Sequence, residues 1–141
     1  MKRNIKLATV AIIALISTAF TANAEVKPYK SLDSKEVITH YVDASLLGSV
    51  NYTKYMFTDD FEYQNTTNKD KFGKKAYMTF LKSVKDLKYN ATQKIDIIDQ
   101  VGNTTIGKVS MDFGTFTRVD YITLLQTEDG WKINKVVTTY P

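Results

Sequence analysis

The sequence predicts an α+β domain in which helices come first and an antiparallel sheet follows. Two stretches, 34–48 and 73–87, repeat apolar residues at spacings of three and four, as the buried face of a helix requires. From Tyr89 onward the spacing changes to two, and turn dipeptides divide this part into strands. Helices and strands that are segregated along a chain are typical of α+β architecture.

The first 24 residues have the pattern of a secretion signal. A basic start precedes an apolar run from Leu7 to Phe20, and Ala22 and Ala24 form the small-x-small site that signal peptidase cleaves. The run is shorter than the roughly 20 apolar residues that cross a bilayer. We therefore expect cleavage after Ala24, a single mature domain over 25–141, and a periplasmic or secreted location. No later stretch approaches a spanning length, so no membrane contact is expected after cleavage.

The basic charge of the chain belongs mostly to that segment. The 141 residues include 19 Lys and Arg against 15 Asp and Glu, which gives a formal charge of +4. Lys2, Arg3 and Lys6 precede the cleavage site and no acidic residue does, so the mature domain keeps 16 basic and 15 acidic residues, a charge of +1. A nearly neutral domain argues against nucleic acid as a partner. The absence of cysteine excludes disulfides, a thiol nucleophile and cysteine-bound metal.

The first helix begins at a capping residue. Asp33 or Ser34 can act as N-cap. Glu36 lies in the first turn, where the unpaired backbone amides and the helix dipole stabilise a carboxylate. The buried stripe is narrow and consists of Val37, Tyr41 and Ala44. Gly48 follows on the same side and is expected to end the helix.

A short strand connects the two helices. One helical turn within 51–56 leads into the strand from Phe57 to Tyr63, with Asp59 and Asp60 expected at a turn, and a polar loop spans 64–71. The second helix, about Gly73 to Leu87, has one apolar face and a lysine-rich face that is expected to be solvated. The four strands of the meander are expected at Asn90–Asp99, Thr104–Phe113, Phe116–Thr127 and Trp131–Thr139, with turns at Gly102-Asn103, Gly114-Thr115 and Asp129-Gly130.

The C-terminal part also resembles a known family. The run from Asp120 to Leu125 and the segment Asp-Gly-Trp-Lys-Ile at 129–133 resemble the putative lumazine-binding family of the nuclear transport factor 2-like superfamily. Earlier positions agree in the same order, so the resemblance covers about residues 33–138. It implies a cone, in which a curved antiparallel sheet wraps around helices and leaves a pocket at its open end. It also implies homodimers that form through the sheet.

Three residues are candidates for catalysis. His40 is the only imidazole and cannot build a metal site alone, so no metal is expected, and its alternative is a structural or surface role. Asp112 and Asp120 each interrupt an apolar strand, and alternation places Asp120 on the face of Ile122 and Leu124. A carboxylate there must be hydrogen-bonded or face a ligand. The alternative for both is a solvated edge or dimer rim.

Six aromatic residues are candidates for stacking on a planar heterocycle, and their alternative is an ordinary core role. They are Tyr41, Phe61, Tyr77, Phe80, Phe116 and Tyr121. No glycine-rich phosphate loop or other cofactor motif is present, so no cofactor is expected. We expect an exported module that binds a small planar or apolar molecule and performs no chemistry. The alternatives are a dehydratase- or isomerase-like enzyme that uses His40, Asp112 or Asp120, and a dimeric protein-interaction module.

Overall fold

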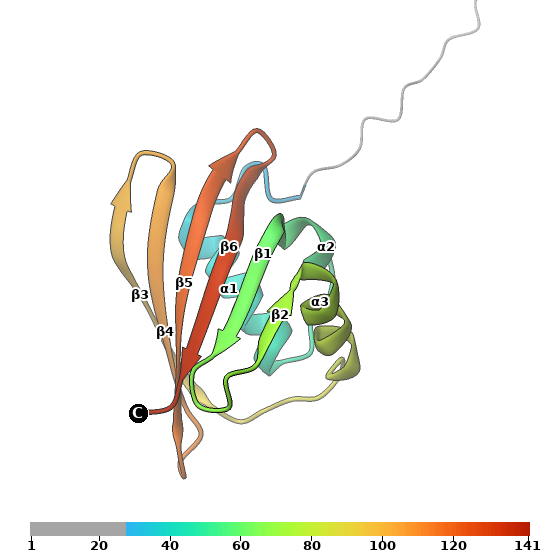
Figure 1. The fold of residues 1–141 in the computed structure, drawn as a ribbon, viewed down its shortest axis with the longest axis vertical. Coiled ribbons are helices and arrows are strands. Elements are labelled where there is room, and N and C mark those ends of the chain that lie inside the picture. The colour runs from blue at the N-terminus through green and yellow to red at the C-terminus, as the bar shows by residue number, and fades with distance from the viewer. Residues whose placement is uncertain (1–27) are drawn as a thin grey trace, which may run out of the picture.

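A computed structural model of the chain describes residues 28–141 and contains three helices and six strands (Figure 1). The expected signal peptide, residues 1–24, lies outside the described residues. In chain order the elements are α1 (Ser34–Leu46), α2 (Thr53–Met56), β1 (Phe57–Asn65), β2 (Lys71–Gly73), α3 (Lys74–Ser83), β3 (Thr92–Val101), β4 (Thr104–Asp112), β5 (Thr117–Thr127) and β6 (Gly130–Thr139).

The six strands form one curved sheet in the order β2-β1-β6-β5-β4-β3. The predicted meander is confirmed, because β3, β4, β5 and β6 pair antiparallel in sequence order. Two features go beyond the prediction. β1 pairs with β6 in parallel, with Glu62 opposite Lys135, and the polar loop at 64–71 is shorter than expected, because β2 pairs Phe72 with Tyr63.

The first helix starts as its sequence predicts. The Asp33 carboxylate accepts from the Glu36 backbone amide at 2.8 Å, and the Glu36 carboxylate accepts from the Asp33 amide at 2.7 Å, which completes a capping box. The helix then buries one face, whose fully buried members are Val37, Ile38, Tyr41, Val42 and Ala44. In Figure 1 this helix lies behind β5 and β6.

The prediction of a turn at Asp59 and Asp60 is wrong. Both residues lie within β1 and are exposed, at a register irregularity between Phe57 and Glu62. The Asn134 side chain of β6 donates to Asp60 Oδ1 at 3.1 Å. β6 thus contacts this irregular part of the strand through a side chain, a long-range neighbour that the local sequence does not reveal.

The helix α3 is shorter than predicted, ending at Ser83, and it packs beside β1 and β2. The linker that follows is fixed to the end of α1, since the Tyr89 amide donates to the Leu46 carbonyl at 2.8 Å. Gly48 has a φ of +65° and approaches the backbone of Asp86 closely, with 3.0 Å from its ideal Cβ position to the Asp86 Cα. The segment 84–91 therefore lies against the C-terminal end of α1.

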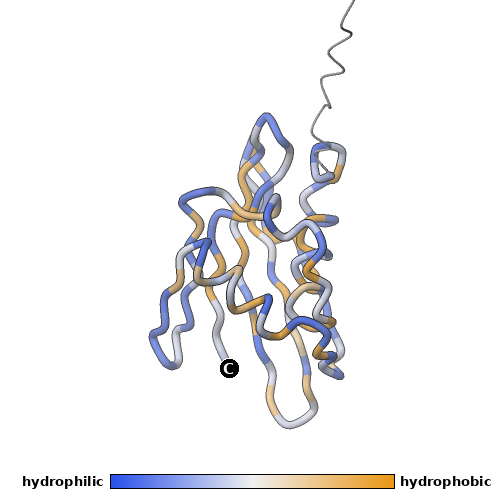
Figure 2. Tube along the Cα trace, turned by 90° about the vertical axis from the view of Figure 1, so that its right-hand side faces the viewer, coloured by the Kyte–Doolittle hydropathy of each residue, from blue (hydrophilic) through white to orange (hydrophobic). Residues whose placement is uncertain are grey.

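The core lies between the helices and the inner face of the sheet. Hydrophobic stretches run through both layers, whereas the turn between β5 and β6 is hydrophilic (Figure 2). The largest fully buried side chains of the core include Tyr41, Tyr77, Phe57, Met111, Ile122 and Ile133. Within residues 28–141, no helix is both long and apolar enough to cross a membrane.

Candidate functional site

A cavity of about 310 Å³ opens where α1 and α3 end and β4 turns into β5. Its wall is mostly apolar and aromatic, with one charged side chain. The lining residues are Ser45, Leu46, Phe80, Val84, Tyr89, Phe113, Phe116, Arg118 and Tyr140. They come from four separate parts of the chain, so only the folded sheet and helices bring them together.

The β4–β5 hairpin builds one side of this cavity. The Asp112 carboxylate accepts from the Gly114 amide at 2.8 Å, and Phe113 and Phe116 close the turn with a backbone hydrogen bond of 3.0 Å. Gly114 has a φ of +88°, a conformation that glycine adopts readily. The two phenylalanine rings consequently stack, with centroids 4.7 Å apart and an interplanar angle of 13°.

An ion pair between Arg118 and Asp120 lies at the inner end of the cavity. The two residues are two positions apart on β5 and so share its inner face. Arg118 Nε donates to Asp120 Oδ1 at 2.9 Å and Nη2 donates to Oδ2 at 2.7 Å. The side chain of Asp120 is 0% exposed and that of Arg118 is 14% exposed. The pair is thus bidentate and nearly removed from water.

Two further donors complete the shell around Asp120. Thr138, its direct partner across β5 and β6, donates from Oγ1 to Oδ1 at 2.7 Å. The Tyr41 hydroxyl donates to Oδ2 at 2.7 Å. Each carboxylate oxygen therefore accepts two hydrogen bonds, which uses its lone-pair sites. Such a carboxylate fixes the groups around it and has no free site from which to remove a proton.

The Tyr41 and Tyr77 hydroxyls extend this cluster and stay neutral. Their oxygens lie 3.1 Å apart. Because the single Tyr41 proton goes to Asp120, Tyr77 is the donor in that bond. Burial raises the pKa of Tyr41 well above its usual range, and the negative charge of Asp120 acts in the same direction. Burial also raises the pKa of Tyr77.

One nitrogen of Arg118, Nη1 with its two N–H groups, is left for an occupant of the cavity. Nε and Nη2 are engaged by Asp120, and Nη2 also donates to Tyr41 at 3.2 Å. Among the described residues, none accepts a hydrogen bond from Nη1. Since the guanidinium is planar, an edge bound to a carboxylate through Nε and Nη2 directs Nη1 away from that carboxylate. Arg118 therefore offers one oriented nitrogen, with two N–H donors, at a cavity that it lines.

The six aromatic candidates occupy four different environments. Phe80 and Phe116 line the cavity, and Tyr41 and Tyr77 lie in the polar cluster behind it. Phe61 is a core residue packed on Phe57 at 4.5 Å between ring centroids. Tyr121 is 41% exposed on the outer face of the sheet, because alternation along β5 places it opposite Asp120. Phe61 and Tyr121 are therefore separate from this cavity.

The three catalytic candidates are not brought together. His40 is exposed and packs edge-on against Tyr29, with ring centroids 5.5 Å apart. Asp112 is exposed and caps the hairpin. Asp120 is fully buried on the face of Ile122 and Leu124, so a solvated rim position does not hold for it.

The sequence interpretation missed several lining residues. Tyr89, Phe113 and Tyr140 come from a linker, a turn and the end of the last strand, where no periodic pattern marks them. Arg118 carried a signal that could have found it. A basic residue two positions before a buried aspartate on one strand shares the same face, and opposite charges there form a natural pair.

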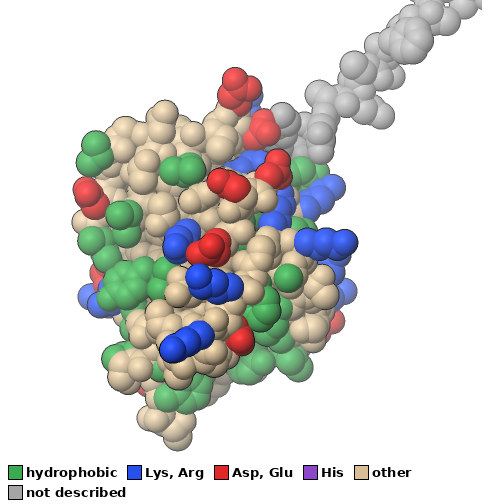
Figure 3. All heavy atoms as spheres, viewed as in Figure 1, with side chains coloured by type: hydrophobic (Ala, Val, Ile, Leu, Met, Phe, Trp, Pro, Cys, Tyr) green, Lys and Arg blue, Asp and Glu red, His purple; other side chains and the backbone are tan. Residues whose placement is uncertain are grey.

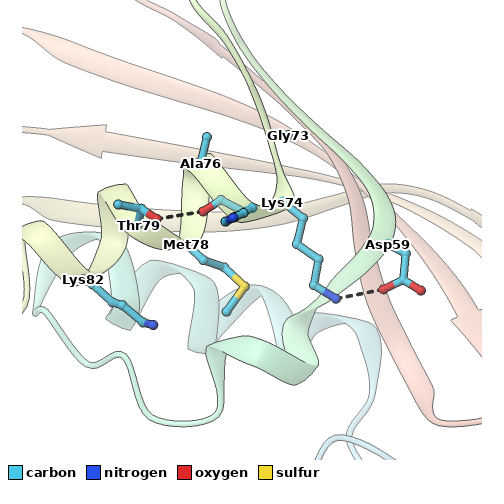
Figure 4. A pocket seen from close by; sticks show the side chains of 8 residues that line it. Asp59, Gly73, Lys74, Ala76, Met78, Thr79 and Lys82 are labelled. Carbon is cyan, nitrogen blue, oxygen red and sulfur yellow. Dashed lines mark hydrogen bonds and ion pairs between the residues drawn. The ribbon is translucent and has the colours of Figure 1, made fainter.

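A second, wider hollow lies between α3 and β1, with a volume of about 720 Å³ (Figure 4). Lys74 reaches across it to Asp59 at 3.1 Å, and this hydrogen bond lowers the pKa of Asp59. The Asp59 side chain is fully exposed, so the pair is a surface contact. In the part of the chain that the structure describes, no three His, Cys, Asp or Glu side chains gather as metal ligands would.

Comparisons with known proteins agree with this architecture. Solved structures of two nuclear transport factor 2-like proteins of unknown function superpose on the chain. The one from Silicibacter pomeroyi has a TM-score of 0.63 at 16% identity and covers 76% of this chain and 92% of its own. The one from Methylobacillus flagellatus has a TM-score of 0.62 at 21% identity, and the match covers 80% of this chain and 98% of that protein. A ketosteroid isomerase-like protein from Erwinia carotovora has a TM-score of 0.60 at 12% identity, and the match covers 75% of this chain and 92% of that protein.

These identities show a shared fold and no more. No curated protein matches the chain. The family model described as "Putative lumazine-binding" matches residues 33–139, which include every helix and strand of the structure. The chain therefore belongs to the putative lumazine-binding family and has the nuclear transport factor 2-like fold.

Proposed function

We propose that the protein is an exported module that holds a small, planar or apolar molecule in the cavity above Arg118 and performs no chemistry on it. The observation that carries the proposal is an aromatic cavity whose one charged lining residue is nearly buried and has a free donor. Ligand sites are typically apolar hollows with a few placed polar groups, and 310 Å³ is at the small end of their range. The family's description supports small-molecule binding as well.

The shape of the wall favours a flat occupant. Phe113 and Phe116 stack on each other, and Tyr140 lies 6.0 Å from Phe116 between ring centroids. Phe80 and Phe116 are 44% and 50% exposed, so much of their apolar surface is open to an occupant. A planar ring system that packs on these faces gains both apolar burial and aromatic contacts.

The geometry argues against the dehydratase- or isomerase-like alternative. Such an enzyme needs a base within hydrogen-bond reach of the substrate. Asp120 already accepts four hydrogen bonds, and Asp112 and His40 lie outside the lining of the cavity. Proton exchange of a bound ketone, followed by NMR in deuterated water, would reveal a catalytic base and would overturn this part of the proposal.

Binding is tested by native mass spectrometry on protein purified from cells that express the full chain. The protein is incubated with lumazine, riboflavin and a lipid extract. We expect one ligand to be retained with one-to-one stoichiometry. Phe116→Ala should weaken binding by roughly threefold to tenfold through lost ring contact, whereas Tyr121→Ala, a change on the outer face, should leave it unchanged. Retention of no ligand, or equal effects of the two variants, would contradict the proposal.

Export is tested with the same expression experiment. A product that begins at Glu25 in the periplasm or medium is expected if cleavage follows Ala24. The intact mass of the purified protein distinguishes this product from one that keeps the first 24 residues. Recovery of the uncleaved chain in the cytosol would contradict export.

Homodimers through the outer face of the sheet are part of the same proposal. On that face Ile106 of β4 is 39% exposed and Tyr121 of β5 is 41% exposed. Figure 3 shows hydrophobic side chains gathered on the side of this view where β3 and β4 lie. Sedimentation velocity should show a dimer that Ile106→Lys disrupts, because a buried, unpaired charge opposes association. A monomer at every concentration would exclude this interface.

A further inference from the structure

We infer that the cavity selects molecules that present a neutral hydrogen-bond acceptor, such as a ring carbonyl or an amide, over molecules that present a carboxylate. Arg118 Nη1 is the donor that reads this group, and Asp120 sets the preference. The inference rests on the proposed binding function and names the class of ligand.

The first step is that the charge of Arg118 is already compensated. An arginine at the inner end of a cavity ordinarily attracts an anion. Here Asp120 holds two nitrogens of the guanidinium at 2.9 and 2.7 Å, and its carboxylate is 0% exposed. The two residues together contribute no net charge to the site. Asp120 thus occupies the position of the anion that a free arginine would bind.

The second step is that the cavity has no other cation. The remaining lining residues, from Ser45 to Tyr140, carry no charge. A carboxylate that entered would lose most of its hydration and would face a neutral pair whose anion lies directly behind Arg118. Removing an ion from water without a compensating charge is strongly unfavourable. The phenols of Tyr41 and Tyr77 do not relieve this, since both are committed within the cluster.

The third step is that a neutral acceptor fits the same position without this cost. A carbonyl oxygen can accept from Nη1 and adds no charge. The stacked rings of Phe113 and Phe116 meanwhile provide a flat apolar surface beside the donor. A planar molecule that carries a carbonyl at one edge would use both features together.

Two probes of the same size and ring system test the preference: 1-naphthamide, which is neutral, and 1-naphthoate, which is anionic. Their dissociation constants for the wild-type protein are measured at neutral pH by isothermal titration calorimetry. We expect 1-naphthamide to bind at least about tenfold more tightly, in proportion to one net hydrogen bond. Methyl 1-naphthoate, a neutral ester, should follow the amide, which separates the effect of charge from that of shape.

Asp120→Asn tests the cause of the preference. The variant keeps the shape of residue 120 but removes the compensating charge, so Arg118 becomes a net cation and 1-naphthoate should gain at least about tenfold relative to 1-naphthamide. Glu62→Gln is the matched control, because it removes one carboxylate from an exposed pair with Lys135 at 3.2 Å. The control should keep the wild-type ratio. Circular dichroism establishes that each variant is folded.

The outcomes separate the inference from the proposed function. Wild-type protein that binds 1-naphthoate as tightly as 1-naphthamide overturns the inference and leaves the binding function intact. Lumazine or riboflavin binding without binding of either neutral probe has the same meaning. Failure of every compound to bind overturns both. An unchanged ratio in folded Asp120→Asn also overturns the inference, and if that variant does not fold, the wild-type comparison of amide, ester and carboxylate decides.

Discussion

The environment of Asp120 makes it the most sensitive single position for stability. Asp120→Ala should lower the free energy of unfolding by about 3–5 kcal/mol, because it leaves the nearly buried Arg118 guanidinium without its partner. Glu62→Ala breaks the ion pair with Lys135, in which both side chains are nearly half exposed, and should cost at most about 1 kcal/mol. Urea denaturation of the two variants measures the difference. Equal losses would contradict the buried character of the Arg118 pair.

The hydroxyl of Tyr29 presents the opposite situation. It is buried and has no hydrogen-bond partner within residues 28–141. Tyr29→Phe should therefore leave the free energy of unfolding unchanged or raise it by up to about 1 kcal/mol at pH 7, since no bond is lost and a buried polar group is removed. Chemical denaturation at neutral pH checks this. A loss of more than 1 kcal/mol would indicate that the hydroxyl is satisfied.

Alkaline pH tests the same residue in another way. Burial raises the pKa of Tyr29 to about 12, whereas a tyrosine in the unfolded chain titrates near 10. Above pH 10 the unfolded chain loses protons that the native protein keeps, so the free energy of unfolding falls as pH rises toward 12, and it is unaffected below pH 10. The fall should be shallower in Tyr29→Phe. Identical slopes in the two proteins between pH 10 and 12 would contradict the shift.

At the level of helices and strands, most of the fold is predictable because its signals are local. The cap at Asp33, the period of the second helix and the turn dipeptides of the meander each lie within a few residues of what they determine. The parallel pairing of β1 with β6 joins Glu62 to Lys135 across the whole second half of the chain, and no short pattern encodes it. The cavity also depends on contacts that are distant in sequence. Alternation along the strand identifies the face on which Asp120 lies, but only the complete sheet brings that face close to Tyr140.

Alanine substitutions at two glycines with similar φ angles test how rigidly the linker after α3 is fixed. Gly48 has a φ of +65° and Gly102 a φ of +55°, but only Gly48 has backbone atoms within 4 Å of an added Cβ. Gly102→Ala should cost about 1–2 kcal/mol from conformational strain alone, and Gly48→Ala should exceed it by about 1–3 kcal/mol because the backbone at Asp86 must move. Thermal or urea unfolding gives both values. Equal costs would show that the linker yields freely.

For the whole molecule, the proposed binding function predicts that an occupied cavity raises stability. The cavity is closed by α1, α3, the linker and the β4–β5 hairpin, so unfolding destroys it completely. A ligand at 100 times its dissociation constant should raise the free energy of unfolding by about 2.7 kcal/mol. Differential scanning fluorimetry should show a higher melting temperature for the wild type and a smaller shift for Phe116→Ala. A ligand that binds without any shift would have to bind the unfolded chain equally well.

The cavity has a buried floor and an exposed wall, and the two differ in how freely they can vary. Arg118 and Asp120 hold α1, α3 and β6 together through Tyr41, Tyr77 and Thr138, so a change there is a change to the fold. Four of the rings at the mouth, those of Phe80, Tyr89, Phe116 and Tyr140, are 40–50% exposed and take no part in this hydrogen-bonded cluster. Under the proposed binding function, substitutions at the mouth should therefore change which molecule the cavity prefers at little cost to the fold, whereas substitutions at the floor should not be tolerated.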